Sequence, residues 1–215
     1  MTIRTLVVDD QSMVRAGLRM LLSHEPDVDV VAEAANGVEA IAQAARFHPD
    51  VVLMDIRMPE LDGLEATRRI LAADDAAKIL ILTTFNLDDY VYEALRAGAS
   101  GFVLKDEPPE QLIAAVRTIA AGDALLSPSV TRNVIAHFTS RQRHPPPRAV
   151  ESLTPRELDV FRLIAAGLSN AEIGHELFIS DTTVKTHITR LLQKLEVRDR
   201  AQAIVLAYQC NLFDD

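Results

Sequence analysis

The sequence predicts an α/β fold, a doubly wound five-stranded parallel sheet, followed by a small all-α four-helix domain. Two observations predict the sheet: short apolar runs recur within residues 1–122, and a helical pattern follows each run. A third observation predicts the second domain, because residues 153–215 show helical spacing and helix-capping signals throughout. A chain of 215 residues is long enough to form both parts.

The expected strands are apolar along their whole length, which is typical of parallel strands that helices cover on both faces. The run Leu6-Val7-Val8 is one example. Helix boundaries are marked between the runs, by Asn36 before one helix and by Gly98 after another. The expected strands are 4–9, 29–34, 51–55, 78–83 and 101–104, and the expected helices are 12–23, 37–47, 63–72, 88–97 and 109–121.

Residues 123–152 interrupt the alternation of strands and helices. The stretch 140–148 is polar, basic and rich in proline, which is typical of a semi-extended linker. Its positive charge could contact DNA phosphates, but a solvated linker is the preferred interpretation. A short helix near 128–139 is expected before it. We therefore expect a first domain at 1–122, a partly helical linker at 123–152 and a second domain at 153–215.

The second domain carries clear helix caps. Thr154 and Glu157 have the spacing of a capping box, and Ser169 and Glu172 repeat it. A short helix, a tight turn and a longer helix then follow in order, which is a helix-turn-helix pattern whose second helix can enter the major groove of DNA. The four expected helices end near Gly167, Leu177, Leu195 and Tyr208.

Composition excludes several classes of protein. The net charge of −9 argues against nonspecific coating of nucleic acid, although it allows a local basic surface. Cys210 is the only cysteine, so one chain can form neither a disulfide framework nor a cysteine metal site, which fits a reducing cytosol. No apolar run approaches the ~20 residues that span a bilayer, and no signal sequence is evident. We expect a cytoplasmic protein without a membrane partner.

Polar side chains follow four of the expected strands where each strand ends. Asp9 ends the first and Asp10 follows it, Asp55 ends the third, Thr83 ends the fourth and Lys105 follows the fifth. Each residue alone is ordinary, but the carboxyl ends of parallel strands meet at one edge of a sheet, so together they predict a site. A divalent cation such as Mg²⁺ would relieve the repulsion between the carboxylates. One carboxylate could then attack a phosphoryl donor, with Lys105 and Thr83 stabilising the transferred group.

Several short motifs stand at the ends of the expected strands and in the loops after them: Val7-Val8-Asp9-Asp10, Met54-Asp55-Ile56-Arg57-Met58-Pro59, Asp62-Gly63, Leu82-Thr83-Thr84, and Gly98 through Lys105. With these motifs, residues 3–121 resemble the receiver domain of bacterial two-component response regulators, which implies a CheY/flavodoxin-like fold. The resemblance implies that Asp55 is the phosphoacceptor and that Asp10 and Asp55 bind Mg²⁺ through their side chains. It also implies that Asp9 acts mainly through water and Arg57 through its backbone carbonyl.

The same resemblance implies a conformational switch made by Thr83 and Phe102. Phe102 stands where many receivers have Tyr, so no hydroxyl takes part in the signal. Asp106 stands where many receivers have Pro, which leaves the geometry of the Lys105–Asp106 peptide bond open. The implied phosphoryl donor is a phosphohistidine on a sensor histidine kinase, or a small acyl phosphate.

The segment 182–195 contains three Lys or Arg residues and no acid, which gives it a local basic face. Helical spacing places Lys185, Thr186, Thr189 and Arg190 on the outer side, where they can reach base edges or phosphates. A solvated helix face is the alternative. The expected buried stripe is Val184, Ile188, Leu191, Leu192 and Leu195.

Three motifs stand out in the second domain: Leu153 through Glu157, Gly167 through Ile173, and Ile179 through His187. With these motifs, the domain resembles the LuxR-type DNA-binding domain. Paired with the receiver, they identify the chain as similar to the NarL/FixJ subfamily of response regulators. The resemblance implies base contacts from Lys185, Thr186 and Thr189, and DNA backbone contacts from Thr183, Arg190 and Lys194. Its last helix resembles a dimerisation helix; core packing is the other interpretation, and the two are compatible. The residues concerned are Ala201, Ile204, Val205 and Tyr208.

The expected function is a transcription regulator whose phosphorylation on Asp55 promotes homodimer formation and binding to a double-stranded DNA operator. RNA polymerase is a further candidate partner. We expect no catalysis beyond self-phosphorylation and self-dephosphorylation. Two alternatives stay open: a constitutive regulator with a vestigial receiver, and an aspartyl-phosphate phosphatase. The phosphatase would have an Asp-x-Asp motif after the first strand, whereas this chain has adjacent acids at Asp9 and Asp10.

Overall fold

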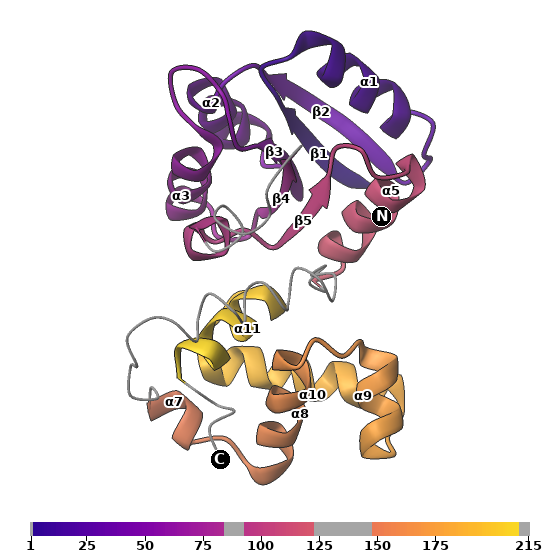
Figure 1. Ribbon diagram of the computed structural model, residues 1–215, viewed down its shortest axis with the longest axis vertical. Helices are drawn as coiled ribbons and strands as arrows, with labels where there is room; N and C mark the ends of the chain where they lie inside the picture. The colour runs from indigo at the N-terminus through magenta and orange to yellow at the C-terminus, as the bar shows by residue number, and fades with distance from the viewer. Residues whose placement is uncertain (1, 84–92, 123–147, 211–215) are drawn as a thin grey trace. The chain divides into compact units, whose positions relative to one another are not determined.

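The computed structural model describes residues 2–83, 93–122 and 148–210 of the chain (Figure 1). The chain divides into two compact units, Met1–Leu125 and Leu126–Asp215. The first unit contains a sheet with helices on both sides. The described part of the second unit is entirely helical.

The sheet of the first unit has five parallel strands in the order β2-β1-β3-β4-β5. All five expected strands are confirmed, each with its ends within one residue of the prediction. Because the strands are parallel, their carboxyl ends lie along one edge of the sheet. The strands are β1 (Ile3–Val8), β2 (Val28–Ala34), β3 (Val51–Asp55), β4 (Lys78–Thr83) and β5 (Gly101–Leu104).

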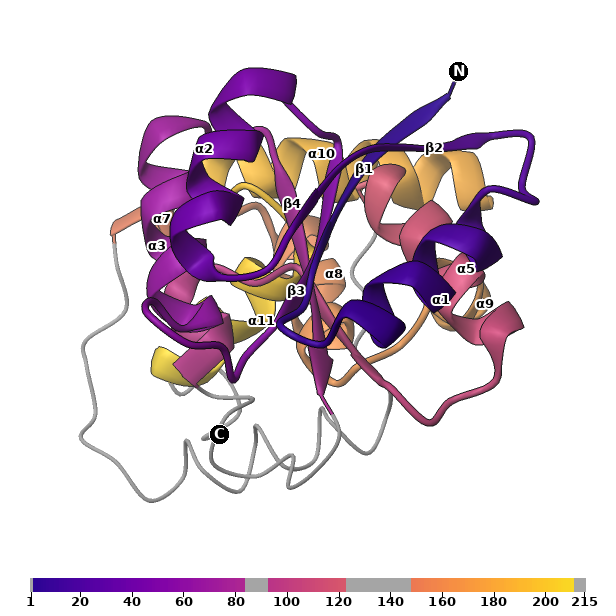
Figure 2. The ribbon, with the colours of Figure 1, turned by 90° about the horizontal axis from the view of Figure 1, so that it is seen from above.

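Helices cover both faces of this sheet, as Figures 1 and 2 show. One face packs on α1 (Ser12–Leu22) and α5 (Pro109–Ala120), and the other on α2 (Gly37–Phe47) and α3 (Gly63–Ala73). Side chains alternate along each strand, so every strand supplies both cores, which explains why the strands are apolar throughout. Of the expected helix 88–97, residues 93–97 are helical and 88–92 lie outside the described residues.

The second unit confirms the four expected helices of the C-terminal domain: α8 (Pro155–Ala165), α9 (Asn170–Leu177), α10 (Asp181–Leu195) and α11 (Arg200–Gln209). A further short helix, α7 (Arg148–Glu151), lies within the expected linker, while the helix expected near 128–139 falls outside the described residues. Both predicted capping boxes are present, at Thr154 with Glu157 and at Ser169 with Glu172. Phe178 ends α9 in the left-handed region, with φ of 55°, and this reverses the chain into α10.

The core of this unit lies between α8, α10 and α11. The apolar stripe of α10 is buried as predicted, except that Leu192 is only half-buried. The Tyr208 hydroxyl of α11 donates a hydrogen bond to the Ala165 carbonyl of α8 at 2.8 Å. Core packing of α11 is therefore confirmed, because all four residues expected in a dimer contact are buried: Ala201, Ile204, Val205 and Tyr208.

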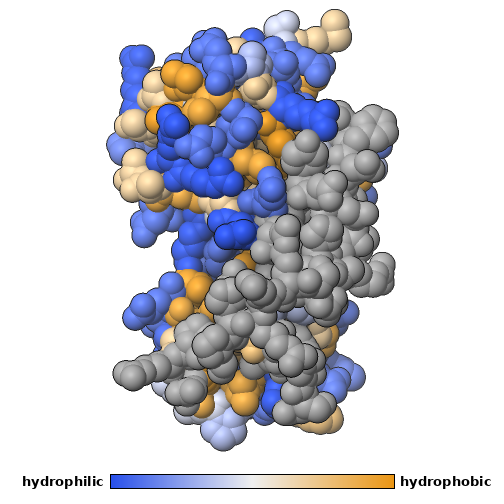
Figure 3. Space-filling view, turned by 60° about the vertical axis from the view of Figure 1, so that its left-hand side comes forward, coloured by the Kyte–Doolittle hydropathy of each residue, from blue (hydrophilic) through white to orange (hydrophobic). Residues whose placement is uncertain are grey.

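On the face that Figure 3 brings forward, hydrophilic and hydrophobic residues are interspersed over the described surface. Among the helices of the described ranges, none combines the length and the apolar character that crossing a bilayer requires.

Candidate functional site

The three predicted acids come together at the carboxyl edge of the sheet. A carboxylate oxygen from each of Asp9, Asp10 and Asp55 lies within 4.8 Å of the others. Asp9 is fully buried and Asp55 is 7% exposed, while Asp10 is exposed. Like charges at this separation repel strongly where water is largely excluded, so the cluster requires positive charge close by.

Lys105 supplies positive charge to the cluster. Its Nζ lies 2.6 Å from Asp9 Oδ2 and 2.9 Å from Asp55 Oδ2. Burial raises the pKa of Asp55 above its ordinary value, and Lys105 opposes this shift only in part. Burial alone would lower the pKa of Lys105, but the two carboxylates outweigh burial and raise it. Lys105 is therefore held as an ammonium ion between two acids.

Backbone contacts fix the two buried acids. The amide of Ile56 donates to Asp55 Oδ1 at 2.8 Å, which leaves Asp55 Oδ2 turned toward Lys105. The amide of Gln11 donates to Asp9 Oδ1 at 2.9 Å. Each carboxylate thus has one oxygen bound by the backbone and the other beside the ammonium.

Gly63 allows the start of α3 to approach Asp55 closely. A Cβ at this position would lie 2.0 Å from the carbonyl oxygen of Asp55, so a larger residue would displace backbone. The Gly63 amide also donates to the Ile56 carbonyl at 2.9 Å, which closes the loop after β3. The Asp-Gly motif found in the sequence therefore has a steric reason here.

The remaining predicted residues of this site are Thr83, Phe102 and Arg57. Thr83 ends β4 and is 9% exposed, and its carbonyl accepts from the Lys105 amide at 2.8 Å. Phe102, one strand away, is 5% exposed, so its side chain is already buried in this structure. Arg57 lies exposed in the loop after Asp55. The Lys105–Asp106 peptide bond, which the sequence left open, is trans.

The donor set fits a hard divalent cation. Three carboxylates supply oxygen ligands, which Mg²⁺ prefers. Asp9 Oδ2 is buried and forms an ion pair with Lys105. It accepts no hydrogen bond of standard geometry from the described residues, so it can interact with further positive charge.

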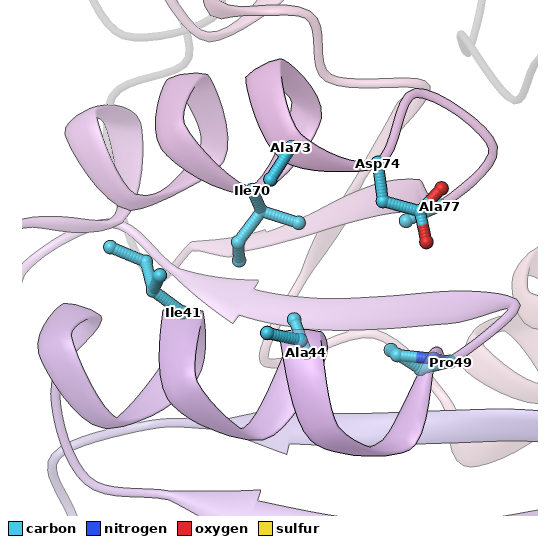
Figure 4. Close-up of a pocket in the computed structure, with 8 residues that line it drawn as sticks. Ile41, Ala44, Pro49, Ile70, Ala73, Asp74 and Ala77 are labelled. Carbon is cyan, nitrogen blue, oxygen red and sulfur yellow. The ribbon is translucent and has the colours of Figure 1, made fainter.

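A small apolar pocket between α2 and α3 lies away from this site, at the opposite edge of the sheet (Figure 4). It lies near Pro49 and Ala77, which precede β3 and β4.

The outer face of α10 presents the predicted polar residues. The hydroxyls of Thr186 and Thr189 each donate to the carbonyl four residues earlier, at 2.9 Å, which leaves their methyl groups and oxygen lone pairs available. Lys185 pairs with Asp181 at 3.2 Å, an exposed contact that is weak and easily exchanged. The exposed residues of this face are Thr183, Lys185, Thr186, Thr189, Arg190 and Lys194.

Lys194 differs from the other cations of α10. Its Nζ lies 2.7 Å from Oε2 of Glu157, the acid of the α8 capping box. The resemblance to the LuxR-type domain implies that Lys194 contacts the DNA backbone, and that contact stays a prediction. In this structure Lys194 binds Glu157 within its own domain.

Two protein-family models match the chain. The response regulator receiver domain matches residues 5–117, and the luxR family of bacterial regulatory proteins matches residues 151–207. The transcriptional regulatory protein LiaR of Bacillus subtilis is 44% identical over 212 residues, which cover 98% of this chain and 99% of LiaR. This chain belongs to the response regulator family.

Solved structures agree with this assignment. The crystal structure of the response regulator ChrA, of a heme-sensing two-component system, is similar over 99% of both chains, with 37% identity and a TM-score of 0.53. A structure of two RcsB dimers bound to two parallel DNAs covers 97% of this response regulator and 99% of that chain, with 25% identity and a TM-score of 0.59.

Sequence reasoning found the acids of this response regulator but missed two contacts. It did not find Glu157 as the partner of Lys194, because the two are far apart in the chain and each has an ordinary local role. It also missed Arg15, which contacts the backbone of Asp9 and Asp10. No spacing rule predicts that contact, since it depends on the path of the loop.

Proposed function

We propose that this response regulator accepts a phosphoryl group on Asp55 and thereby controls its binding to DNA. The observation that carries the proposal is the position of Asp55 at the end of β3, beside Lys105 and two further carboxylates. A response regulator with both domains implies a kinase partner, and we infer a sensor histidine kinase as the donor, with a small acyl phosphate as a substitute.

In the proposed reaction, a carboxylate oxygen of Asp55 forms a bond to phosphorus as the bond to the donor breaks, and the donor keeps the bonding electron pair. The Ile56 amide fixes the carboxylate, and Lys105 neutralises charge on the phosphoryl oxygens. Thr83 would donate its hydroxyl to the same group. When bound, Mg²⁺ would neutralise further charge, held by Asp10, Asp55 and the Arg57 carbonyl directly and by Asp9 mainly through water.

The proposed output is a shift in a pre-existing equilibrium toward a homodimer. Thr83 would move toward the phosphoryl group, and Phe102 would hold the inward position it has here. Two α10 helices would then read half-sites about one DNA turn apart. The RcsB dimers on DNA support this arrangement by analogy.

The decisive experiment is intact mass spectrometry of the full chain with acetyl phosphate and Mg²⁺. The wild-type protein should gain about 80 Da, the mass of one phosphoryl group. Asp55→Asn, which keeps the size of the side chain, should gain nothing. A wild-type protein that never gains this mass, or an Asp55→Asn variant that gains it equally, would refute the proposal.

DNA recognition requires a separate test, in which operator DNA is selected from a random pool and binding is measured over a range of salt concentrations. Arg190→Ala should weaken binding to all sequences and reduce the salt slope by about 1, as expected for a phosphate contact. Lys185→Ala should also relax sequence preference, as expected for a base contact. Arg68→Ala removes an exposed cation from α3 in the other unit and serves as the control.

The two alternatives have distinct signatures. A constitutive regulator with a vestigial receiver is not favoured, because its acidic set would not need to stay complete and grouped. DNA affinity that is equal in wild type and Asp55→Ala under phosphodonor would support it. A phosphatase would instead show steady turnover of a phosphoester.

We place the proposed activity in the cytoplasm, with RNA polymerase as a further candidate partner.

A further inference from the structure

Arg15 connects helix α1 to the loop that carries two of the three acids. Its Nη1 donates to the carbonyl oxygen of Asp9 at 2.7 Å and lies 3.2 Å from that of Asp10. The side chain is only 18% exposed although it belongs to the first turns of a surface helix. It therefore runs back along the helix toward the end of β1.

The loop has few other side-chain contacts among the described residues. Gln11, the N-cap residue of α1, makes no side-chain capping bond, and the first turn of this helix contains no acid. Two hydrogen bonds hold Asp9. Its amide donates to the Ala34 carbonyl at 3.2 Å, and its Oδ1 accepts from the Gln11 amide at 2.9 Å. The exposed Asp10 is thus the less constrained acid, and Arg15 is the side chain that contacts its backbone.

Glu33 of β2 holds Arg15 in this position. Glu33 Oε2 lies 3.8 Å from Arg15 Nε, and its Oε1 accepts from Arg19 Nη1 at 2.9 Å. Arg19 is 65% exposed and lies one turn further along α1. Within the described residues, Arg19 makes no observed contact with the loop of Asp9 and Asp10. The two arginines thus share one carboxylate, but only Arg15 contacts the loop of the acids.

We propose that Arg15 is a positioning residue for the cation site, which fixes the backbone of Asp9 and Asp10 so that their carboxylates stand at the separation Mg²⁺ requires. This inference rests on the proposed function of the acidic site. Mg²⁺ demands near-ideal octahedral geometry, so a small displacement of one ligand weakens binding. Outer contacts that orient metal ligands typically change affinity by about 10- to 100-fold when removed.

The sign of the effect separates positioning from simple electrostatics. Arg15 carries positive charge beside the loop of Asp9 and Asp10, so removing only its charge would tighten cation binding. Removing a positioning contact would weaken it. We therefore propose calorimetric titration of the full chain with Mg²⁺ alone, without phosphodonor, for wild type, Arg15→Met, Arg15→Lys and the control Arg19→Met.

Arg15→Met and Arg15→Lys should each bind Mg²⁺ about tenfold more weakly than wild type. Arg19→Met should stay within about twofold, because an exposed ion pair contributes little. Equal or tighter binding by Arg15→Met would overturn the inference. Wild-type affinity in Arg15→Lys would overturn it as well, since the guanidinium contacts with the carbonyl groups of Asp9 and Asp10 would then not be needed.

A second readout distinguishes positioning from general loss of structure. In phosphorylation by acetyl phosphate, the half-saturating Mg²⁺ concentration of Arg15→Met should rise about tenfold, while the rate at saturating Mg²⁺ stays within about twofold. The proposal would be refuted if the phosphorylation rate at saturating Mg²⁺ fell in proportion to the amount of folded protein. Arg15→Gln, which keeps one amide donor, replaces Arg15→Met if the latter does not fold.

The outcomes for the two proposals differ. If wild type binds Mg²⁺ and gains a phosphoryl group while Arg15→Met titrates as wild type does, only the inference on Arg15 fails. If Arg15→Met weakens Mg²⁺ binding but wild type never gains mass, the inference stands and the phosphoacceptor proposal fails. If wild type neither binds Mg²⁺ nor gains a phosphoryl group, both fail.

Discussion

The ammonium group of Lys194 lies 2.7 Å from Oε2 of Glu157. This contact joins the last turn of α10 to the capping box at the first turn of α8. The Glu157 side chain is 8% exposed, and the hydrogen bond from Lys194 is the main cause of a pKa lowered to about 2. The helix proposed to read DNA is therefore fixed on its neighbour by a cation of its own.

We predict that Lys194→Met reduces the stability of the second unit more than it reduces DNA affinity. The substitution leaves the Glu157 carboxylate without its cationic partner, and it should cost about 1 kcal/mol in the free energy of unfolding. Urea denaturation followed by circular dichroism measures this cost. Arg190→Met, which removes a cation from the exposed face of the same helix, is the matched control. Unchanged stability with a large loss of DNA affinity in Lys194→Met would contradict the prediction.

The same contact predicts a pH dependence of stability. The pKa of Glu157 lies lower in the folded chain than its ordinary value of 4.5. The ionised carboxylate therefore contributes its full share to the free energy of unfolding above pH 4.5. This contribution is lost as the pH falls from there toward about 2, the folded value. The difference in unfolding free energy between wild type and Glu157→Gln should shrink over this interval. A difference that stays constant through it would show that the ion pair contributes nothing.

Two glycines give a matched test of the packing around Asp55. Gly63→Ala should destabilise the first unit by about 1 to 3 kcal/mol, because its Cβ would lie 2.0 Å from the Asp55 carbonyl oxygen. Gly17→Ala, in α1, meets nothing within 4 Å and should stabilise by about 0.5 to 1 kcal/mol through higher helix propensity. Thermal unfolding measures both. Equal effects of the two substitutions would contradict the close approach of α3 to β3.

Magnesium should raise the melting temperature of the wild-type chain, because a cation that binds only the folded state stabilises it. Asp10→Asn removes a proposed ligand that is exposed, and it should reduce this shift with little effect on stability without Mg²⁺. The shift is measured by differential scanning calorimetry over a series of Mg²⁺ concentrations. A shift of the same size in Asp10→Asn would remove Asp10 from the proposed ligand set.

Most of the fold was predictable from the sequence because local signals agreed with one another. The run Val51-Val52-Leu53-Met54 could be assigned to a covered parallel strand, since only such a strand is apolar on both sides. The acids of the site were predictable for the same reason: once Asp9 and Asp55 end parallel strands, the topology brings them to one edge.

The role of individual side chains was less predictable. Lys194 is an exposed cation on a basic helix by every local criterion, and only the packing of α10 on α8 reveals Glu157 beside it. Helical spacing likewise placed Leu192 in the buried stripe, but it is half-buried, because the width of the stripe depends on which neighbours cover it.

By itself, the sequence determined the order of strands and helices along the chain and the helix caps, because these follow from short-range patterns. It also determined the group of acids at one edge of the sheet, because the carboxyl ends of parallel strands lie together. Only the tertiary structure decided which cations serve the fold and which face outward. Arg15 contacts the loop of Asp9 and Asp10, and Lys194 contacts Glu157, because contacts between distant segments depend on how whole elements pack.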